Sequence, residues 1–308
     1  MTSLTNSERF LTWMAIEQGR SPRTIEAYRR DLLRYQGFLI DNSVDELSVN
    51  SQGVEKFIAV LRAEGKASKS VARMYASVRM LHRFLVEERI RIDNPTSGVD
   101  GVKVPSGIPK ALSEDQVSRM LASVTGVDSL SLRDRALLEF LYATGARISE
   151  ACGLSLSDLD MESQLVRLFG KGSKERIVPF GSHAKSALED WLGAGGRAML
   201  VPDQWAKRDY ADAVFLGSRG TRLSRQAAWG IVRKYAQIAD LGDEISPHVL
   251  RHSCATHMLI HGADLRIVQE LLGHASVSTT QVYTRVDNEV LFSMYREAHP
   301  RARLGFAK

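Results

Sequence analysis

The sequence predicts a mainly α-helical protein of two domains, the second of which contains a small β-hairpin or sheet. Three observations predict this fold. Apolar residues recur at helical spacing through residues 1–90, and the densest cluster of Pro, Gly, Ser and Asn falls within 91–110. Two short β-prone runs then flank a Gly-rich turn near residue 171. We therefore expect a helical domain at 1–90, a linker at 91–110 and an α+β domain at 111–308.

The composition is that of a globular protein, with 44% hydrophobic and 25% charged residues in a chain of 308, long enough for two cores. No apolar run has the length of a membrane span, and the N-terminus lacks the apolar segment of a signal peptide. We expect a cytoplasmic protein without membrane insertion. The two cysteines, Cys152 and Cys254, are too few for a disulfide framework and are expected to be small core residues.

The formal net charge of +5 permits binding to a polyanion, although several classes of protein share this balance. Residues 1–110 hold 17 Lys and Arg against 13 Asp and Glu, whereas residues 111–308 hold 24 against 23. The basic excess therefore lies in the first third of the chain.

The first domain is expected to contain helices at Thr5–Gln18, from Pro22 with Ser21 as its cap, at Ser51–Ala63 and at Ser68–Glu88. Basic residues occupy positions away from the apolar stripes. They include Arg23, Arg30, Lys69, Arg73 and Arg79. A four-helix bundle with a solvated basic face is the ordinary interpretation of this pattern.

In the second domain, Ser113 and Gln116 have the spacing of a capping box, which predicts a helix to about Ser123. The further expected elements are a helix at Leu130–Thr144, strands at Leu165–Phe169 and Arg176–Phe180, a helix at His183–Gly193, a short strand at 214–217, a helix capped by Ser224, and a last helix at Asn288–Glu297. Residues 195–212 have no pattern that we can interpret.

Two arginines near helix starts are candidate ligand contacts. Arg147 follows Gly145 and stands three residues before Glu150, a spacing that by itself indicates an ordinary surface ion pair. Arg225 and Gln226 lie in the first turn after Ser224, and their donor and acceptor patterns match guanine and adenine in the major groove.

Residues 246–286 concentrate polar groups that can hold a phosphodiester. Ser246 and Pro247 predict a helix start, which places His248 and Arg251 on one face near its N-terminus, where the free N–H groups favour an anion. Asp264 is expected to cap a second helix that reaches Leu272. His274 follows Gly273 at the exit of that helix, and Ser278 or Thr279 is expected to cap a third helix that carries Tyr283.

Each of these residues also has an ordinary interpretation. A lone Tyr on a helix is most often a packing residue. Two histidine pairs, His248 with His252 and His257 with His261, have the i, i+4 spacing of metal ligands, but neither is accompanied by the remaining residues of a zinc-protease motif. We therefore expect no metal, and structural roles for His252, His257 and His261.

Three features together resemble the signature of the tyrosine recombinases: an HxxR motif, an LLGH motif, and a Tyr nine residues after the His of LLGH. The sequences PHVLRH, ATHML and STTQVYT are similar to the Xer branch of this family. ATGARISEACGL resembles the first catalytic box of this family, GKGSKERIVP its hairpin, and SPRTIEAYRRDL its core-binding, SAM-like domain. The last of these resemblances implies that the basic residues of the first domain contact DNA phosphates, namely Arg23, Arg30, Lys69, Arg73 and Arg79. The fold implied is a two-domain DNA clamp, with a helical N-terminal bundle and an α+β catalytic domain.

The resemblance implies a role for each site residue. Tyr283 would be the nucleophile and would form a 3′-phosphotyrosyl bond. Arg147, His248, Arg251 and His274 would hold the scissile phosphate, Glu150 would support Arg147, and Lys171 would enter the minor groove and protonate the 5′ oxygen. It implies no cofactor, because the phosphotyrosyl bond conserves the energy of the broken linkage.

The resemblance also implies a substrate and partners. The substrate would be double-stranded DNA with inverted half-sites, and the partners a second Xer-type recombinase in a heterotetramer and a septal DNA translocase as activator. The implied role is the resolution of chromosome dimers at a dif-like site before cell division. The terminal helix is expected to dock onto a neighbouring protomer. The alternatives are an integrase or transposon-type recombinase, a topoisomerase that uses the same residues, and a non-catalytic architectural DNA-binding protein.

Overall fold

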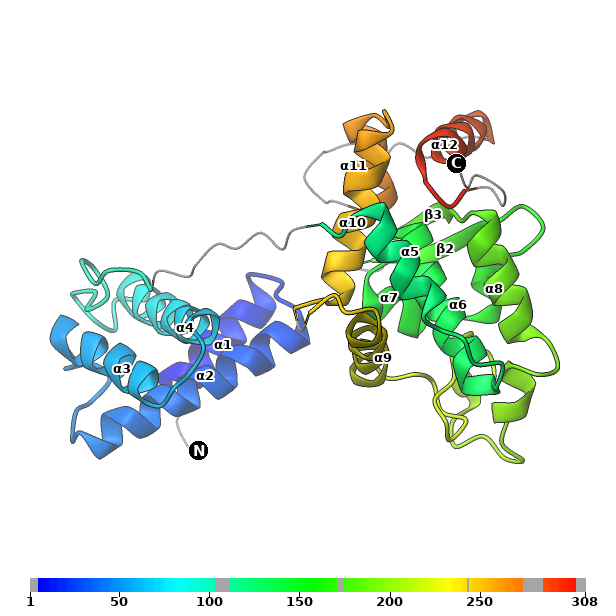
Figure 1. Ribbon diagram of the computed structural model, residues 1–308. Coiled ribbons are helices and arrows are strands. Elements are labelled where there is room, and N and C mark those ends of the chain that lie inside the picture. Colours follow the sequence, from blue (N-terminus) through cyan, green and yellow to red (C-terminus); the bar gives the residue numbers. More distant parts are fainter. Residues whose placement is uncertain (1–4, 103–110, 171–173, 243, 274–284, 303–308) are drawn as a thin grey trace. The chain divides into compact units, whose positions relative to one another are not determined.

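The chain forms two compact units, Met1–Gly107 and Ile108–Lys308, as the computed structural model in Figure 1 shows. The structure describes all residues except 1–4, 103–110, 171–173, 243, 274–284 and 303–308, and it describes only the backbone of 285–291. Each unit contains its own clusters of buried apolar side chains. The prediction of a mainly helical fold with a small sheet is confirmed.

The described part of the first unit contains the four predicted helices: α1 (Asn6–Ile16), α2 (Pro22–Asp41), α3 (Ser51–Ala63) and α4 (Ser68–Glu87). The Ser21 hydroxyl accepts a hydrogen bond from the Thr24 N–H at 3.2 Å, which satisfies one of the free donors at the start of α2. Aromatic rings pack between these helices; those of Tyr35 and Phe57 lie 5.0 Å apart in an edge-to-face arrangement. Packing of the predicted apolar stripes therefore holds the bundle together.

The first unit extends beyond the predicted boundary at residue 90. Arg91 is buried and donates hydrogen bonds to the carbonyls of Glu46, at 3.0 Å, and Val49, while the Tyr75 hydroxyl donates to the Val99 carbonyl at 3.0 Å. The first part of the predicted linker is thus folded onto the bundle. Pro, Gly and Ser predict turns, but composition alone cannot distinguish a packed turn from a free connection.

The second unit is built around one buried helix. Its elements are α5 (Glu114–Ala122), α6 (Ser129–Thr144), α7 (Ile148–Gly153), β1 (Leu159–Asp160), β2 (Leu165–Phe169), β3 (Glu175–Pro179), α8 (Ser182–Leu192), α9 (Arg225–Ile238), α10 (Pro247–Ile260), α11 (Leu265–Leu272) and α12 (Arg285–Ala298). From Ala136 to Thr144 every residue of α6 is buried, as expected for a helix that neighbours cover on all sides.

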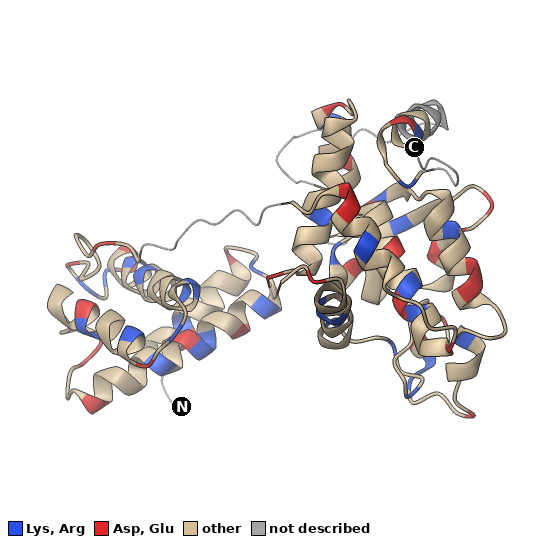
Figure 2. Ribbon diagram, in the orientation of Figure 1, with Lys and Arg blue, Asp and Glu red and all other residues tan. Residues whose placement is uncertain are grey.

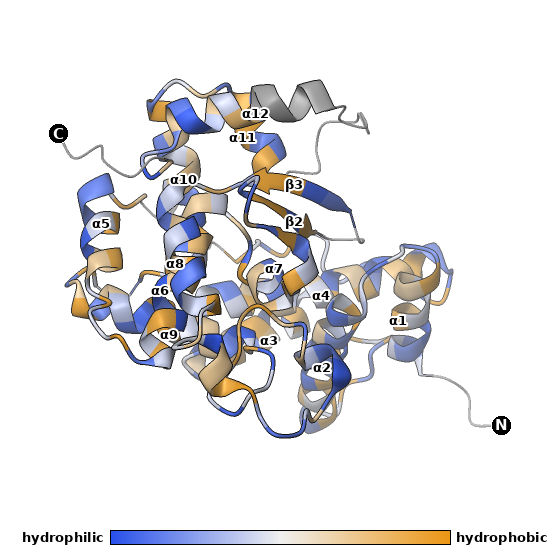
Figure 3. Cartoon of the chain, turned by 90° about the vertical axis from the view of Figure 1, so that its right-hand side faces the viewer, coloured by the Kyte–Doolittle hydropathy of each residue, from blue (hydrophilic) through white to orange (hydrophobic). Residues whose placement is uncertain are grey.

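The sheet is antiparallel in the order β1-β2-β3, with Val166 opposite Val178 and Leu168 opposite Arg176. The hairpin of β2 and β3 was predicted, whereas β1 was not. Val166, Leu168 and Val178 are buried, so one face of the hairpin packs on the core. In Figure 3, β2 is largely orange, whereas β3 is orange along one part and blue, that is hydrophilic, along the other.

The predicted strand at 214–217 is wrong. Residues 214–216 are buried, but this stretch and the preceding Ala213 pair only through isolated bridges, Ser155 with Ala213 and Leu216 with Arg222. Its apolar residues are explained by core packing, which an apolar run of this length cannot distinguish from a strand. Within residues 195–212, the structure has two short 3-10 turns, Arg197–Leu200 and Arg208–Tyr210.

The described C-terminal residues pack onto their own unit. Tyr295 is buried, and its hydroxyl accepts a hydrogen bond from the Gly181 N–H at 3.0 Å. Arg301 forms an ion pair with Glu139, with 2.9 Å between Nε and Oε2. Docking of α12 onto a neighbouring protomer therefore stays a prediction. Among the described helices, none is both long and apolar enough to cross a membrane.

Candidate active site

The site begins at the turn between α6 and α7. Gly145 ends α6 in the left-handed conformation, with φ of 57°, and a Cβ added there would lie 2.5 Å from Cδ2 of Leu272. Only glycine fits this position without strain or displacement of its neighbour. The turn thus allows the start of α7 to lie close to the end of α11.

Arg147 stands immediately before α7 and contacts Glu150, as its sequence spacing predicts. Glu150 Oε2 accepts the Arg147 backbone N–H at 2.7 Å, and Oε1 accepts a side-chain bond from Arg147 Nη1 at 2.9 Å. Arg147 Nη2 also donates to the Gly273 carbonyl at 3.1 Å. The Arg147 side chain is 37% exposed, so part of the guanidinium remains open to a ligand.

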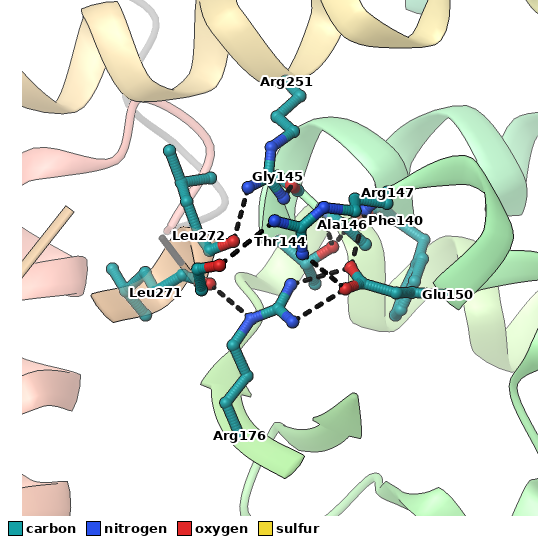
Figure 4. A network of polar contacts seen from close by, with 11 residues as sticks. Phe140, Thr144, Gly145, Ala146, Arg147, Glu150, Arg176, Arg251, Leu271 and Leu272 are labelled. Carbon is teal, nitrogen blue, oxygen red and sulfur yellow. Dashed lines mark hydrogen bonds and ion pairs between the residues drawn. The ribbon is translucent and has the colours of Figure 1, made fainter. Parts of the chain in front are cut away.

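Arg251 approaches the same place from α10, as Figure 4 shows. Its guanidinium donates to the Gly145 carbonyl at 2.6 Å and to the Leu272 carbonyl. Burial, followed by the like charges of Arg147 and Arg176, lowers the pKa of Arg251 to about 10. Arg251 therefore remains charged at neutral pH, in a place where further positive charge is unfavourable.

A third arginine, Arg176 on β3, completes the cluster. Its Nη1 and Nη2 donate to Oε1 and Oε2 of Glu150 at 2.8 and 2.7 Å. Burial acts to raise the pKa of Glu150, but the hydrogen bonds and charge of Arg176, together with those of Arg147, outweigh burial and lower it. Glu150 is therefore an ionised carboxylate between two guanidinium groups.

Three guanidinium groups thus surround one carboxylate, which leaves an excess of positive charge in a partly buried place. We refer to Arg147, Glu150, Arg176 and Arg251 as the arginine cluster. Uncompensated buried charge is costly unless an anion is bound, and the planar fork of arginine suits two oxygens of a phosphate. The geometry therefore fits a site for a phosphodiester.

His248 lies in the first turn of α10 and is exposed. His257 is structural, as predicted: it is buried between the Tyr142 hydroxyl at 2.7 Å and the Leu112 carbonyl at 2.7 Å. His261 contacts Glu114, and His252 is exposed. No group of three or more His, Cys, Asp or Glu in the described ranges has the arrangement of a metal site.

Three of the predicted catalytic residues, Lys171, His274 and Tyr283, lie outside the described residues. In the sequence, Lys171 belongs to the connection between β2 and β3, and His274 directly follows Gly273, whose carbonyl Arg147 holds. The structure therefore brings together Arg147, Glu150 and Arg251 from the predicted set.

The predicted DNA contacts of the first unit lie on α2 and α4, where basic residues are visible in Figure 2. All five are exposed: Arg23, Arg30, Lys69, Arg73 and Arg79. Arg73, however, forms an ion pair with the buried Asp31, which also accepts from the Ser77 hydroxyl at 2.9 Å, so it has a structural role as well. In the second unit, Arg225 and Gln226 are exposed in the first turn of α9, as predicted.

Arg176 was missed by the sequence reasoning, although a signal for it exists. In a strand, alternate residues face the same side, so Arg176 shares the side of the buried Val178 and Phe180. A charged residue on the core side of a strand requires a partner. That requirement points to a buried carboxylate, which the structure identifies as Glu150.

The chain matches models of known protein families. The family model described as the phage integrase family matches residues 110–289, and the model of its N-terminal SAM-like domain matches residues 8–89. The chain therefore belongs to the phage integrase family. Membership identifies it as a tyrosine recombinase, an enzyme that cleaves and rejoins DNA.

Curated relatives specify the branch. The chain is 44% identical over 301 residues to the tyrosine recombinase XerD of Bifidobacterium longum (strain NCC 2705), which covers 96% of this chain and 97% of the relative. It is 42% identical over 295 residues to the tyrosine recombinase XerD of Proteus mirabilis, with 96% and 92% covered. The predicted resemblance to the Xer branch is confirmed.

Solved structures share the fold. The XerH site-specific recombinase bound to a palindromic difH substrate matches with a TM-score of 0.69 and 22% identity, covering 96% of this chain and 85% of that chain. A lambda integrase dimer bound to a core site matches with a TM-score of 0.68 and 16% identity, covering 90% and 98%. At these identities the likeness concerns the fold alone.

Proposed function

We propose that this tyrosine recombinase uses Tyr283 as its nucleophile and the arginine cluster as its phosphate site, and that it resolves chromosome dimers at a dif-like site before cell division. The observation that carries the proposal is the convergence of Arg147 and Arg251 on the end of α11, within hydrogen-bond distance of Gly273 and Leu272. The sequence that follows Gly273 contains His274 and Tyr283. The guanidinium groups are thus bound to carbonyls that lie shortly before the expected nucleophile in the sequence.

The reaction is a transesterification. The Tyr283 oxygen attacks the phosphorus, a 3′-phosphotyrosyl bond forms, and the bond from phosphorus to the 5′ oxygen breaks. Lys171 donates a proton to that leaving oxygen, while Arg147 and Arg251, with His248 and His274, stabilise the charge on the nonbridging oxygens. The 5′ hydroxyl of a second strand then attacks the phosphotyrosyl bond and releases Tyr283. No metal or nucleotide enters this balance.

The DNA substrate is double-stranded and carries inverted half-sites, because a pseudo-symmetric pair of protomers matches a pseudo-symmetric site. The proposed assembly is a heterotetramer with a second Xer-type recombinase, activated by a septal DNA translocase in the cytoplasm. The similarity to proteins named XerD and the fold shared with a recombinase bound to difH support this assignment.

A suicide substrate tests the chemistry. A duplex with dif-like inverted half-sites and a nick beside the cleavage position loses the released fragment, which traps the covalent protein–DNA adduct. We expect an adduct with the wild type, none with Tyr283→Phe, and a normal yield with the control Tyr210→Phe, which alters a tyrosine on a 3-10 turn. No adduct with the wild type would favour a non-catalytic DNA-binding protein.

A second assay separates the enzymatic alternatives. A recombinase should exchange strands only when two sites are present, whereas a topoisomerase should relax a supercoiled plasmid that carries no second site. Recombination between two identical dif-like sites, in the presence of the second Xer-type recombinase and the translocase, supports the proposal. Recombination only between unlike sites would instead favour an integrase or transposon-type enzyme.

A further inference from the structure

Arg176 occupies a position that neither a DNA contact nor an ordinary surface ion pair explains. Its side chain is 12% exposed, and each of its three nitrogens donates to a protein group. Nη1 and Nη2 hold the two oxygens of Glu150, and Nε donates to the Leu271 carbonyl at 2.8 Å. A side chain with this set of contacts is not presented to a DNA phosphate.

The contacts of Arg176 connect three separate segments. Arg176 itself is on β3, Glu150 is on α7, and Leu271 is in the last turn of α11, as Figure 4 shows. In the sequence, Lys171 lies shortly before β3, Arg147 lies directly before α7, and His274 lies two residues after the end of α11. One guanidinium thus ties together the elements that supply three of the proposed catalytic residues.

The Arg176 side chain also packs closely against Gly273. Gly273 has φ of 67°, and a Cβ added there would lie 3.2 to 3.3 Å from atoms of the Arg176 side chain. The C-terminal glycine of α11 therefore packs directly against this arginine. The end of α11 is held by three guanidinium groups, from Arg176, Arg251 and Arg147, which donate to successive carbonyls.

The Glu150 carboxylate transmits the position of Arg176 to Arg147. Its side chain is 2% exposed, and Oε1 accepts from both arginines, at 2.8 Å from Arg176 and 2.9 Å from Arg147. If Arg176 is lost, Arg147 is the one guanidinium among the described residues that still donates to the buried carboxylate. The Arg147 guanidinium is then drawn towards Glu150 and away from the place of a phosphate.

We propose that Arg176 is a positioning residue for DNA cleavage: by holding the Glu150 carboxylate and the Leu271 carbonyl, it fixes the Arg147 guanidinium relative to the end of α11. This inference rests on the proposed function of the arginine cluster. It predicts a defect in the chemical step, because displacement of a catalytic group by about 1 Å can cost about 100-fold in rate.

The test measures the single-turnover rate of adduct formation on the nicked duplex, and DNA binding separately. Arg176→Gln should slow adduct formation about 100-fold and change the dissociation constant for DNA less than about 3-fold, because the side chain makes no phosphate contact. The matched control is Arg167→Gln, on the neighbouring strand of the same hairpin, where the side chain is 47% exposed and pairs with Asp158. This control should cleave at the wild-type rate.

A double-mutant cycle distinguishes positioning through Glu150 from an independent role. In a Glu150→Ala background, Arg176→Gln should slow adduct formation far less than in the wild type, because the contact with the carboxylate is already broken and only the contact with the Leu271 carbonyl remains. Effects that multiply in the double variant would overturn the proposal. So would a large loss of DNA affinity with a shallower salt dependence, which would indicate a phosphate contact.

Arg176→Lys covers the case in which Arg176→Gln does not fold. Lysine keeps the charge but cannot hold both oxygens of Glu150 and the Leu271 carbonyl together, so an intermediate rate is expected well below the unfolding temperature. A wild-type rate for Arg176→Lys would overturn the positioning role. If the wild-type protein forms no Tyr283-dependent adduct, the proposed function fails; if it does and Arg176→Gln cleaves equally fast, only the positioning role fails.

Discussion

The Arg251 guanidinium donates a hydrogen bond to the Gly145 carbonyl across 2.6 Å, so α10 is tied directly to the turn that precedes Arg147. The same guanidinium also holds the Leu272 carbonyl, and the Leu272 side chain lies against Gly145. A residue proposed to bind the scissile phosphate is therefore also part of the structure that orders the site. Loss of Arg251 should therefore affect both DNA cleavage and stability.

Arg251→Ala should abolish adduct formation while weakening DNA binding only modestly, because many other phosphate contacts contribute to affinity. Loss of a charged donor to two buried carbonyls should also lower the free energy of unfolding by about 1.5–3 kcal/mol. Trapping on nicked DNA, a binding titration and urea unfolding measure the three effects. Arg266→Ala, exposed on α11, is the control. A large, uniform loss of DNA binding would indicate that Arg251 merely anchors the DNA backbone.

Gly145→Ala should lower the free energy of unfolding by about 2 kcal/mol or more, because alanine is strained at a positive φ and its methyl group would meet Leu272. Chemical denaturation measures this change. Gly153→Ala is the control, since an added Cβ there meets no atom within 4 Å, and its effect should stay within about 1 kcal/mol. Equal stability of the two variants would show that the close approach of Gly145 and Leu272 is not maintained in solution.

Lys171→Ala should slow cleavage of ordinary DNA, and the defect should be relieved when the 5′ bridging oxygen is replaced by a better leaving group such as sulfur. The physical reason is that a good leaving group departs without a proton. Adduct formation on the two substrates, with Lys174→Ala as control on the same hairpin, measures the effect. Absence of rescue would remove the general-acid role from Lys171.

The free energy of unfolding should fall as the pH drops below about 6.5, the pKa of a free histidine, in part because of His299. Burial lowers the pKa of His299 to about 3, and its Nδ1 accepts the Arg301 N–H at 3.2 Å, as a neutral ring does. Since the unfolded chain binds the proton first, the contribution of His299 is complete above about pH 6.5 and declines by up to about 1.4 kcal/mol per pH unit below it, until the folded pKa is reached.

Urea unfolding between pH 7 and pH 4 measures this dependence. His299→Gln should be less stable at pH 7 but should lose less stability on acidification than the wild type. The control His252→Gln changes an exposed histidine and should follow the wild-type profile. Parallel profiles for the wild type and His299→Gln would contradict the burial of a neutral His299.

Local signals in the sequence predicted the helices well. Ser113 and Gln116 form the predicted capping box, and α11 spans Leu265–Leu272 as its cap and apolar spacing indicate. These features depend on residues within a few positions of one another, and for this reason a single sequence reveals them. The pair of Arg147 and Glu150 belongs to the same category.

Features that depend on distant partners were missed or misplaced. The run at 214–217 is apolar because the core covers it, although it forms no strand, and Arg91 begins a packed segment because the Glu46 and Val49 carbonyls accept its hydrogen bonds. Neither outcome is encoded in neighbouring residues.

Arg147 and Arg251 could be proposed as phosphate contacts from the sequence alone, since they stand in motifs of the family, and the helices beside them could be predicted from local patterns. The meeting of both guanidinium groups at the carbonyls of α11, and the sharing of Glu150 by Arg176 and Arg147, became apparent only in the folded chain. The physical reason is that hydrogen bonds act over about 3 Å, whereas their donors and acceptors here are far apart along the chain. The folded core brings them within that range.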